Sequence, residues 1–392
     1  MPKKVYIESM ICSRRALDAK RFESYFLANG FVITNSPKKA DFILFMTCAY
    51  TKIKEDWALK IIQELSRYKA QLIIGGCLKG INEERLYRNF KGFAFIPPNN
   101  ETIDELFPDF KIKFKDIPDS NIPYPIKKLR SLRSYFFILK TDFSFLKRLK
   151  IYMESNFFRR YCYLRIGWGC IDPHCTYCKI WRAVGKLRSK PIDICLAEFK
   201  RALENGYRNI VLDADNLGAY GLDINLTFLD LLSRLLEEKG DYKIEIRDFH
   251  PFWLIKYLDG LISFLRLGKI RLFQCAIQSG NNRILKLMKR RHNKVQIKEA
   301  LQKIKDAYPK IKLHTHIMVG FPSETEAEFE ETLDLIREID FDVVSIFGYS
   351  KNPYILDPEI VNHEIPREII EKRINKAAKF CRKHRIAYSC FG

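Results

Sequence analysis

The sequence contains no apolar run that approaches the roughly 20 residues needed by a membrane-spanning helix. Its first residues, MPKKVYIES, enter a strand-like pattern directly and lack the apolar segment of a secretory signal peptide. Internal repeats and low-complexity segments are also missing. We therefore expect a soluble cytoplasmic protein that has no membrane partner.

Acidic residues are in deficit, because 68 Lys and Arg stand against 47 Asp and Glu, for a formal net charge of +21. A basic surface attracts phosphates and releases counterions on binding, so this imbalance favours a polyanionic partner. The alternative is a basic protein that binds nothing acidic. The 11 cysteines, in a chain without a secretory signal, indicate metal or redox chemistry rather than disulfides.

Residues 1–115 alternate short apolar runs with amphipathic stretches, a pattern typical of βαβ units on a parallel sheet. We predict an α/β domain of flavodoxin-like or Rossmann-like type here. The expected strands are Lys4–Glu8, Asp41–Met46, Gln71–Gly75 and Gly92–Ile96, and the expected helices are Ala16–Asn29, Ile53–Tyr68 and Glu83–Phe90.

From residue 116 to 160 this alternation stops. The segment begins with Pro118, Pro123 and Pro125 and then becomes basic, with interleaved aromatic residues such as Tyr135 and Phe143. Cations hold phosphates while bases stack on aromatic rings, so this linker is a candidate contact for single-stranded RNA. An amphipathic helix that packs its aromatic face on the next domain is the alternative.

Residues 161–392 repeat a strand-then-helix pattern six times, which predicts parallel strands with right-handed crossovers. We expect a partial (β/α)6 barrel, with its chemistry at the C-terminal ends of the strands. The expected strands are Tyr163–Ile166, Asn209–Asp213, Lys243–Arg247, Arg271–Ile277, Lys312–Val319 and Val343–Phe347, and the helices include Cys195–Glu204, Leu226–Lys239, Lys294–Ala307, Glu324–Ile339 and Arg367–His384.

Cys170, Cys175 and Cys178 follow the first barrel strand directly. Three thiolates so close together can ligate three irons of a [4Fe–4S] cluster and leave its fourth iron open to an external chelator. The amino and carboxylate groups of S-adenosylmethionine (SAM) suit that position, and an electron from the reduced cluster can break a carbon–sulfur bond of SAM. The alternatives are a zinc site, with His174 as fourth ligand, or buried structural thiols.

This segment resembles the radical SAM superfamily, whose usual signature is C-x3-C-x2-C, although four residues separate the first two cysteines here. Within the superfamily, the barrel resembles the methylthiotransferases, with similar motifs in the family's order. These motifs are Arg182 to Pro191, Asp215-Asn216 with Tyr220-Gly221, Arg247 with His250-Pro251, Gln278-Ser279-Gly280, Leu285 to Arg290 and Val319 to Thr325.

Several of these positions suit SAM binding. The acidic and amide side chains follow strand ends, where they can hydrogen-bond the methionine moiety or the ribose. The two basic side chains can hold the SAM carboxylate, and the glycine can let adenine approach the backbone. A structural loop residue is the alternative at each position. The predicted cofactor-binding residues are Tyr177, Lys186, Arg188, Asp215, Asn216, Gln278 and Gly320.

Cys12, Cys48 and Cys77 each follow a predicted strand of the N-terminal domain. Parallel strands bring their C-terminal ends to one sheet edge, so the three thiols indicate a second metal cluster; the alternative is three small buried residues. The methylthiotransferases resemble this arrangement, since three N-terminal cysteines hold an auxiliary [4Fe–4S] cluster that serves sulfur transfer. Thr47-Cys48-Ala49 and Gly75 to Leu78 match the family's motifs, whereas Met46 and Ile11 to Arg14 depart from them.

The resemblance implies insertion of sulfur and a methyl group at an unactivated C–H carbon, with two [4Fe–4S] clusters and with SAM as radical source and methyl donor. Known members modify an adenosine of tRNA or an aspartate of a ribosomal protein. Their usual small C-terminal β-barrel, of TRAM type, is not expected here. We predict a tRNA base as substrate and flavodoxin or ferredoxin as reducing partner. The alternatives are a peptide or protein substrate, another radical SAM reaction, or a non-enzymatic iron–sulfur or zinc protein that binds RNA.

Overall fold

The computed structural model describes all residues except 11, 126–160, 172–174, 356 and 392. The described residues form two compact units. Unit 1 contains the described residues up to 125 together with Lys179–Lys186, and unit 2 contains those within Ser144–Cys178 and Leu187–Gly392. The basic and aromatic part of the predicted linker, including Tyr135 and Phe143, lies outside the described residues.

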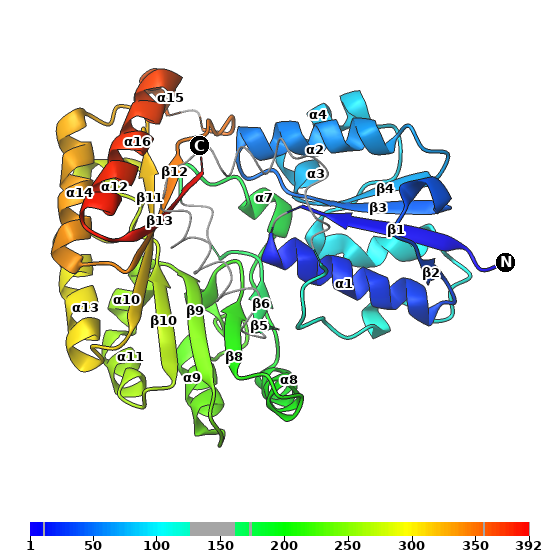
Figure 1. Ribbon diagram of the computed structural model, residues 1–392, viewed down its shortest axis with the longest axis horizontal. Helices are drawn as coiled ribbons and strands as arrows, with labels where there is room; N and C mark the ends of the chain where they lie inside the picture. Colours follow the sequence, from blue (N-terminus) through cyan, green and yellow to red (C-terminus); the bar gives the residue numbers. More distant parts are fainter. Residues whose placement is uncertain (11, 126–160, 172–174, 356, 392) are drawn as a thin grey trace. The chain divides into compact units, whose positions relative to one another are not determined.

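Unit 1 is built on a parallel sheet whose strand order is β2-β1-β3-β4 (Figure 1). The strands are β1 (Lys4–Ser9), β2 (Val32–Ile33), β3 (Phe42–Thr47) and β4 (Gln71–Gly76). This order confirms the flavodoxin-like expectation. The strand predicted at Gly92–Ile96 is wrong. Only an isolated bridge joins Ala94 to Ile74, because the chain turns at Pro97 into a 3-10 helix.

Helices cover both faces of this sheet, because successive strand residues point to opposite sides. Ile43 and Phe45 pack with α2 and α3, whereas Leu44 and Met46 pack with α1 and the 3-10 helices that follow β4. The helices are α1 (Ser13–Ala28), η1 (Pro37–Lys39), α2 (Lys52–Leu65), α3 (Cys77–Ile81), α4 (Glu83–Asn89), η2 (Pro97–Glu105), η3 (Phe114–Asp116) and α7 (Trp181–Val184).

Unit 2 contains a seven-stranded parallel sheet in the order β13-β12-β11-β10-β9-β8-β5 (Figure 1). The six predicted strands are present, which confirms the partial barrel. A seventh strand, β13, adds an edge beyond β12. The strands are β5 (Tyr161–Arg165), β8 (Asn209–Asp213), β9 (Lys243–Phe249), β10 (Ile270–Cys275), β11 (Lys312–Val319), β12 (Val343–Gly348) and β13 (Ala387–Phe391), and β6 (Gly167–Trp168) pairs with β7 (Arg188–Ser189) as a small antiparallel ribbon.

The helices of unit 2 pack their apolar sides on one face of this sheet (Figure 1). Three of them, α9, α13 and α14, begin at capping boxes, in which the N-cap and N3 side chains satisfy backbone N–H groups reciprocally. The helices are α8 (Ile192–Glu204), η4 (Leu217–Ala219), α9 (Phe228–Glu237), α10 (Pro251–Lys256), α11 (Leu258–Leu265), α12 (Asn282–Leu287), α13 (Lys294–Ala307), α14 (Glu326–Ile339), α15 (Pro358–Val361) and α16 (Arg367–Lys383).

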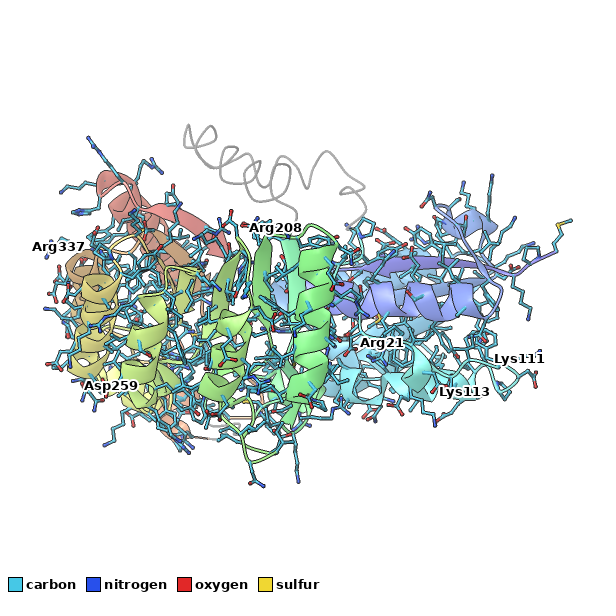
Figure 2. The ribbon with its side chains drawn as sticks, turned by 90° about the horizontal axis from the view of Figure 1, so that it is seen from below. Arg21, Lys111, Lys113, Arg208, Asp259 and Arg337 are labelled. Atoms are coloured by element: carbon cyan, nitrogen blue, oxygen red, sulfur yellow. The ribbon has the colours of Figure 1, made fainter. Side chains whose placement is uncertain are left out.

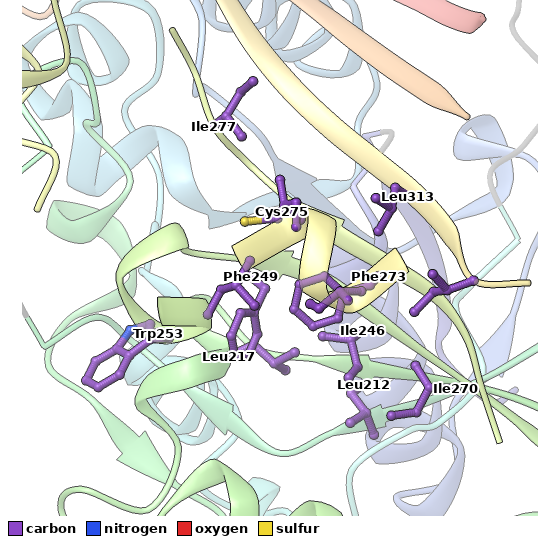
Figure 3. Packing of buried hydrophobic residues seen from close by; sticks show 14 of the residues in the cluster. Leu212, Leu217, Ile246, Phe249, Trp253, Ile270, Phe273, Cys275, Ile277 and Leu313 are labelled. Carbon is purple, nitrogen blue, oxygen red and sulfur yellow. The ribbon is translucent and has the colours of Figure 1, made fainter. Parts of the chain in front are cut away.

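The core of unit 2 fills the space between sheet and helices (Figure 3). Leu212, Ile246, Phe273 and Leu313 project from neighbouring strands into this core and are fully or almost fully buried. Each such side chain contributes roughly 1.5–3 kcal/mol through burial. The alternate residues of the same strands, such as Glu245, carry polar groups on the other face, which therefore suits polar ligands.

Charged side chains such as Arg208, Asp259 and Arg337 lie on the outside of unit 2 (Figure 2). Within the described residues, no helix combines the length and the apolarity required to cross a bilayer.

Candidate active site

The first barrel cysteine, Cys170, is held by the turn that follows β8. The amide of Asn216 donates a hydrogen bond to Cys170 Sγ (3.4 Å), and Trp253 Nε1 donates to Asn216 Oδ1 (3.1 Å). Asp215 Oδ2 accepts from the backbone N–H of Gly169 (2.9 Å), a residue with a φ of 76°. Two residues predicted to bind SAM therefore also orient the cysteine turn.

Burial raises the pKa of the Cys170 thiol, and the hydrogen bond from Asn216 opposes that rise. The amide thus favours the thiolate, which is the form of cysteine that binds metals.

The other two barrel cysteines lie in a turn that is anchored to the loop after β10. Cys178 N–H donates to Cys175 C=O (3.0 Å). Thr176, between them, is bound by its N–H to Met288 C=O (3.2 Å) and by its hydroxyl to Leu287 C=O (2.9 Å). The positions of both cysteines therefore depend on α12 and its C-terminal end.

Arg290 places a buried positive charge at this turn. Only 8% of its surface is exposed, and Nη1 lies 3.5 Å from Cys175 Sγ and 3.1 Å from the Tyr177 hydroxyl. Its Nη2 donates to Ala276 C=O (2.6 Å). Burial raises the pKa of Tyr177 and Arg290 opposes the rise, so this half-buried tyrosine remains a neutral phenol. Sequence reasoning noted Arg290 within a motif but did not select it as a site residue.

Asn352, in the loop after β12, is a site residue that sequence reasoning missed. It is 6% exposed, and its Nδ2 donates to Thr176 C=O (2.9 Å) and to Cys178 C=O (3.2 Å). These bonds join the cysteine turn to a segment about half the chain away. A single asparagine outside any motif carries no signal from which this role could be found.

Replacing Asn352 with alanine is expected to destabilise unit 2 by about 1–3 kcal/mol, because two carbonyls lose a buried donor. Asn352→Asp is expected to destabilise unit 2 more than Asn352→Ala does, since a carboxylate oxygen would face the same two carbonyl oxygens. Urea unfolding and the alkylation rate of Cys178 measure both effects. An aspartate variant as stable as the alanine variant would contradict this assignment.

Gln278 and Gly320 lie where the loops after β10 and β11 meet. Gln278, with a φ of 69°, forms an isolated parallel bridge to β11 through the carbonyl of His316 and the N–H of Met318. Gly320 has a φ of 74°, and a Cβ atom there would lie 2.5 Å from Cγ1 of Ile370. Close packing of α16 therefore explains this glycine, while its contact with adenine stays a prediction.

The two predicted carboxylate-binding cations are both exposed. Arg188, in unit 2, has its guanidinium 5.2 Å from the centre of the Trp168 ring. Lys186 belongs to unit 1. Their role toward SAM stays a prediction.

In unit 1, the three N-terminal cysteines follow three neighbouring strands. Cys12 is the N-cap of α1, Cys48 follows β3 and Cys77 is the first residue of α3 after β4. Cys12 and Cys48 lie close enough for each thiol to act on the pKa of the other, and Cys77 acts electrostatically on Cys48. The Cys48 side chain lowers the pKa of Cys12 to about 6, with help from Arg15 and Arg14, while the Cys12 side chain and burial raise the pKa of Cys48.

Backbone geometry at this edge explains the residues around the thiols. Gly76 has a φ of 96°, and a Cβ atom there would collide with the backbone of Thr47. The Thr47 hydroxyl donates to Gly75 C=O (2.8 Å) and accepts from Leu78 N–H (3.2 Å). The threonine before Cys48 and the glycines before Cys77 therefore fix how β3 and β4 present these cysteines.

The donor chemistry of both cysteine sets fits iron–sulfur clusters, since thiolates are their usual ligands. In the part of the chain that the structure describes, no three His, Cys, Asp or Glu side chains are arranged so that they could hold a metal ion together. The structure brings the N-terminal cysteines to one sheet edge, holds Cys170 through Asn216 and anchors Cys175 and Cys178 in one turn. Which thiols are ligands stays a prediction.

Comparison with known proteins connects these features. A model of the Radical SAM superfamily matches residues 169–336, and one described as uncharacterized protein family UPF0004 matches residues 4–96. A probable threonylcarbamoyladenosine tRNA methylthiotransferase from Pyrococcus horikoshii is 28% identical over 89% of this chain and 77% of its own length. The ribosomal protein uS12 methylthiotransferase RimO of Chlamydia felis is 29% identical over 89% and 72%. The tRNA-2-methylthio-N(6)-dimethylallyladenosine synthase of Clostridium botulinum is 28% identical over 95% and 80%.

Solved structures share the fold at low sequence identity. TsrM from Kitasatospora setae, a radical S-adenosylmethionine methyltransferase with cobalamin and a [4Fe-4S] cluster bound, is 12% identical, with a TM-score of 0.60 over 88% of this chain and 75% of that one. The cobalamin-dependent enzyme OxsB is 13% identical, with a TM-score of 0.56 over 98% and 62%.

Proposed function

Because this chain belongs to the radical SAM methylthiotransferase family, we propose that it inserts sulfur and a methyl group at an unactivated C–H carbon of a tRNA base. The cofactors of this enzyme class are SAM and [4Fe–4S] clusters. The observation that carries the proposal is the placement of two cysteine sets at C-terminal strand ends, one set in each α/β unit.

In this proposal, Cys170, Cys175 and Cys178 hold the cluster of unit 2, and Cys12, Cys48 and Cys77 hold the cluster of unit 1. When bound, the first supplies the electron that cleaves SAM and the second supplies the sulfur. Asn216 and Arg290 each direct an N–H group at a barrel thiol and so fix its direction, and the Asn216 amide also favours the thiolate form of Cys170.

The protein's part toward SAM is binding and orientation. Asp215, Asn216 and Gln278 lie just beyond strand ends and offer polar groups to the methionine moiety or ribose. Tyr177, neutral and half-buried, offers a hydroxyl beside the cysteine turn. Lys186 and Arg188 are the cations proposed for the SAM carboxylate.

A tRNA substrate is favoured by two of the three relatives above, which are named for tRNA, and by the net charge of +21. A protein substrate is the second candidate, because the Chlamydia felis relative is named for a ribosomal protein. Flavodoxin or ferredoxin is the proposed reductant.

The test compares wild type with the Cys12/Cys48/Cys77→Ala triple variant after anaerobic reconstitution. We expect about eight irons per chain to fall to about four, because one of two four-iron clusters loses its ligands. Cleavage of SAM to 5′-deoxyadenosine should continue, while methylthiolated nucleosides in tRNA should disappear.

A matched triple variant, Cys162/Cys381/Cys390→Ala, removes three cysteines outside both sets and should keep the wild-type iron content. About four irons in the wild type and in the Cys12/Cys48/Cys77 variant alike would overturn the two-cluster proposal.

A further inference from the structure

A basic pocket, here called the α12 pocket, lies beside α12 in the loop region after β10. Its volume is about 350 Å³, and its lining residues are Asn282, Lys286, Lys289, Arg290, Arg291 and His292. Four of these six are cations and none is a carboxylate. A hollow of this composition attracts an anion whose oxygen atoms accept hydrogen bonds.

Two lysines of the α12 pocket differ from the nearby Arg283 of α12 in their ion pairing. Arg283 donates from Nε (2.6 Å) and Nη2 (2.7 Å) to the two carboxylate oxygens of Glu328. Lys286 and Lys289 are exposed, and neither forms an ion pair with a carboxylate of the described residues. Their charge is therefore available to a ligand.

Two buried side chains of the α12 pocket have unsatisfied polar atoms. His292 is 7% exposed, and the backbone of Ile277 is the one hydrogen-bonding neighbour of its ring, which leaves a ring nitrogen unsatisfied within the described part of the chain; Arg290 Nε has no hydrogen-bond partner there. Burial lowers the pKa of His292 to about 3, so its ring is neutral and offers one N–H donor. Because buried polar groups in proteins are normally hydrogen-bonded, these atoms indicate a missing partner.

The α12 pocket also adjoins the cysteine turn. Arg290 lines the pocket and reaches Cys175 Sγ, and Met288, at the end of α12, accepts a hydrogen bond from Thr176. A group bound here is therefore held at the edge of the sheet where the chemistry of the proposed function takes place.

We propose that the α12 pocket binds a backbone phosphate of an RNA substrate. This inference rests on the proposed function and assigns a site on this chain to the backbone of the RNA substrate. The lining side chains are rich in donors and poor in acceptors: Asn282 Oδ1 already accepts from Lys294 N–H, which leaves one ring nitrogen of His292. A phosphodiester has acceptors and no donors, whereas a peptide backbone needs both.

The test measures binding of fluorescently labelled bulk tRNA to wild type and to the Lys286→Gln/Lys289→Gln/Arg291→Gln variant over a range of salt concentrations. We expect the variant to bind at least about 10-fold more weakly, with a salt slope smaller by about 0.7–0.9 for each phosphate that it no longer neutralises. Iron content and the thermal midpoint establish that the variant is folded.

The matched control is Arg266→Gln/Lys303→Gln/Lys310→Gln, which removes the same charge from exposed positions on the elements that precede β10 and β11. An equal loss in both variants would overturn the proposal, because net charge alone would explain binding. The proposal would also be overturned if the wild type bound inorganic phosphate but not tRNA, or if the pocket variant lost binding of a peptide substrate and kept binding of tRNA. Since the assay needs no turnover, a pocket-specific loss without any methylthio product would leave the pocket standing and the proposed function refuted.

Discussion

Replacing Arg290 with methionine is expected to slow reductive SAM cleavage by about 100-fold, equivalent to about 2.7 kcal/mol. The guanidinium binds Cys175 Sγ, the Tyr177 hydroxyl and Ala276 C=O from a buried position. Hydrogen bonds that involve a charged group contribute about 1.5–3 kcal/mol each. Methionine retains much of the side-chain volume and removes all three hydrogen bonds, so the Cys175 thiol loses this positive neighbour.

The measurement is 5′-deoxyadenosine formation with chemical reductant, together with iron content. Arg290→Lys keeps the positive charge but lacks the planar guanidinium, so its rate of 5′-deoxyadenosine formation should lie between those of the wild type and Arg290→Met. Arg234→Met, on the exposed side of α9, controls for loss of an arginine and should match wild type. A wild-type rate in the methionine variant with full iron content would remove Arg290 from the site.

The second large effect is a loss of stability on going from about pH 5 to about pH 8, on the order of 3 kcal/mol. It comes from Glu324, which is 3% exposed. Its Oε2 accepts from Gly320 N–H (2.8 Å) and from Arg373 Nη1 (2.9 Å). Burial raises the pKa of Glu324 to about 7, although both of these hydrogen bonds oppose the rise.

A raised pKa means that the folded protein holds this proton more tightly than the unfolded chain. The contribution of Glu324 is therefore complete below the unfolded pKa of 4.5 and is lost as the pH rises through about 7. Glu324→Gln keeps the shape of the side chain and cannot ionise. The free energy of unfolding of this variant should therefore change less between the two pH values than that of the wild type, by on the order of 3 kcal/mol. Urea unfolding of both proteins at the two pH values measures the difference. Parallel profiles would show that Glu324 is ionised throughout.

Several elements could be predicted because their signals are local. Strands β8 and β11 were predicted with their observed bounds, since β8 is a short buried apolar run and β11 alternates buried with partly exposed residues, and both patterns are typical of strands. The convergence of Cys12 and Cys48 could be predicted for a topological reason, because parallel neighbouring strands end at one edge. In β13 all five residues are at least partly exposed and Ser389 interrupts the apolar ones, so this short stretch has neither a buried apolar run nor a regular alternation.

The remaining site features depend on tertiary interactions that no local pattern encodes. Asn352 reaches the cysteine turn from a loop far along the chain. Arg290 reaches it because the backbone changes direction after α12, at Lys289, whose φ is 53°. Gly320 was interpreted as an approach for adenine, whereas its surroundings show the packing of Ile370. Interactions of this kind require the folded arrangement of several loops at once.

The segment Lys179–Lys186 has a consequence for biosynthesis. Ala183, on α7, is fully buried in the core of unit 1, where a Cβ atom at Gly80 would lie 2.7 Å from its Cα. Strands β5 and β6 of unit 2 precede α7 in the chain. As the nascent polypeptide leaves the ribosome, the N-terminal unit thus stays without its last helix until two strands of the next unit have emerged. Multidomain chains usually fold one domain after the other, whereas here unit 1 is completed only after part of unit 2 has been synthesised.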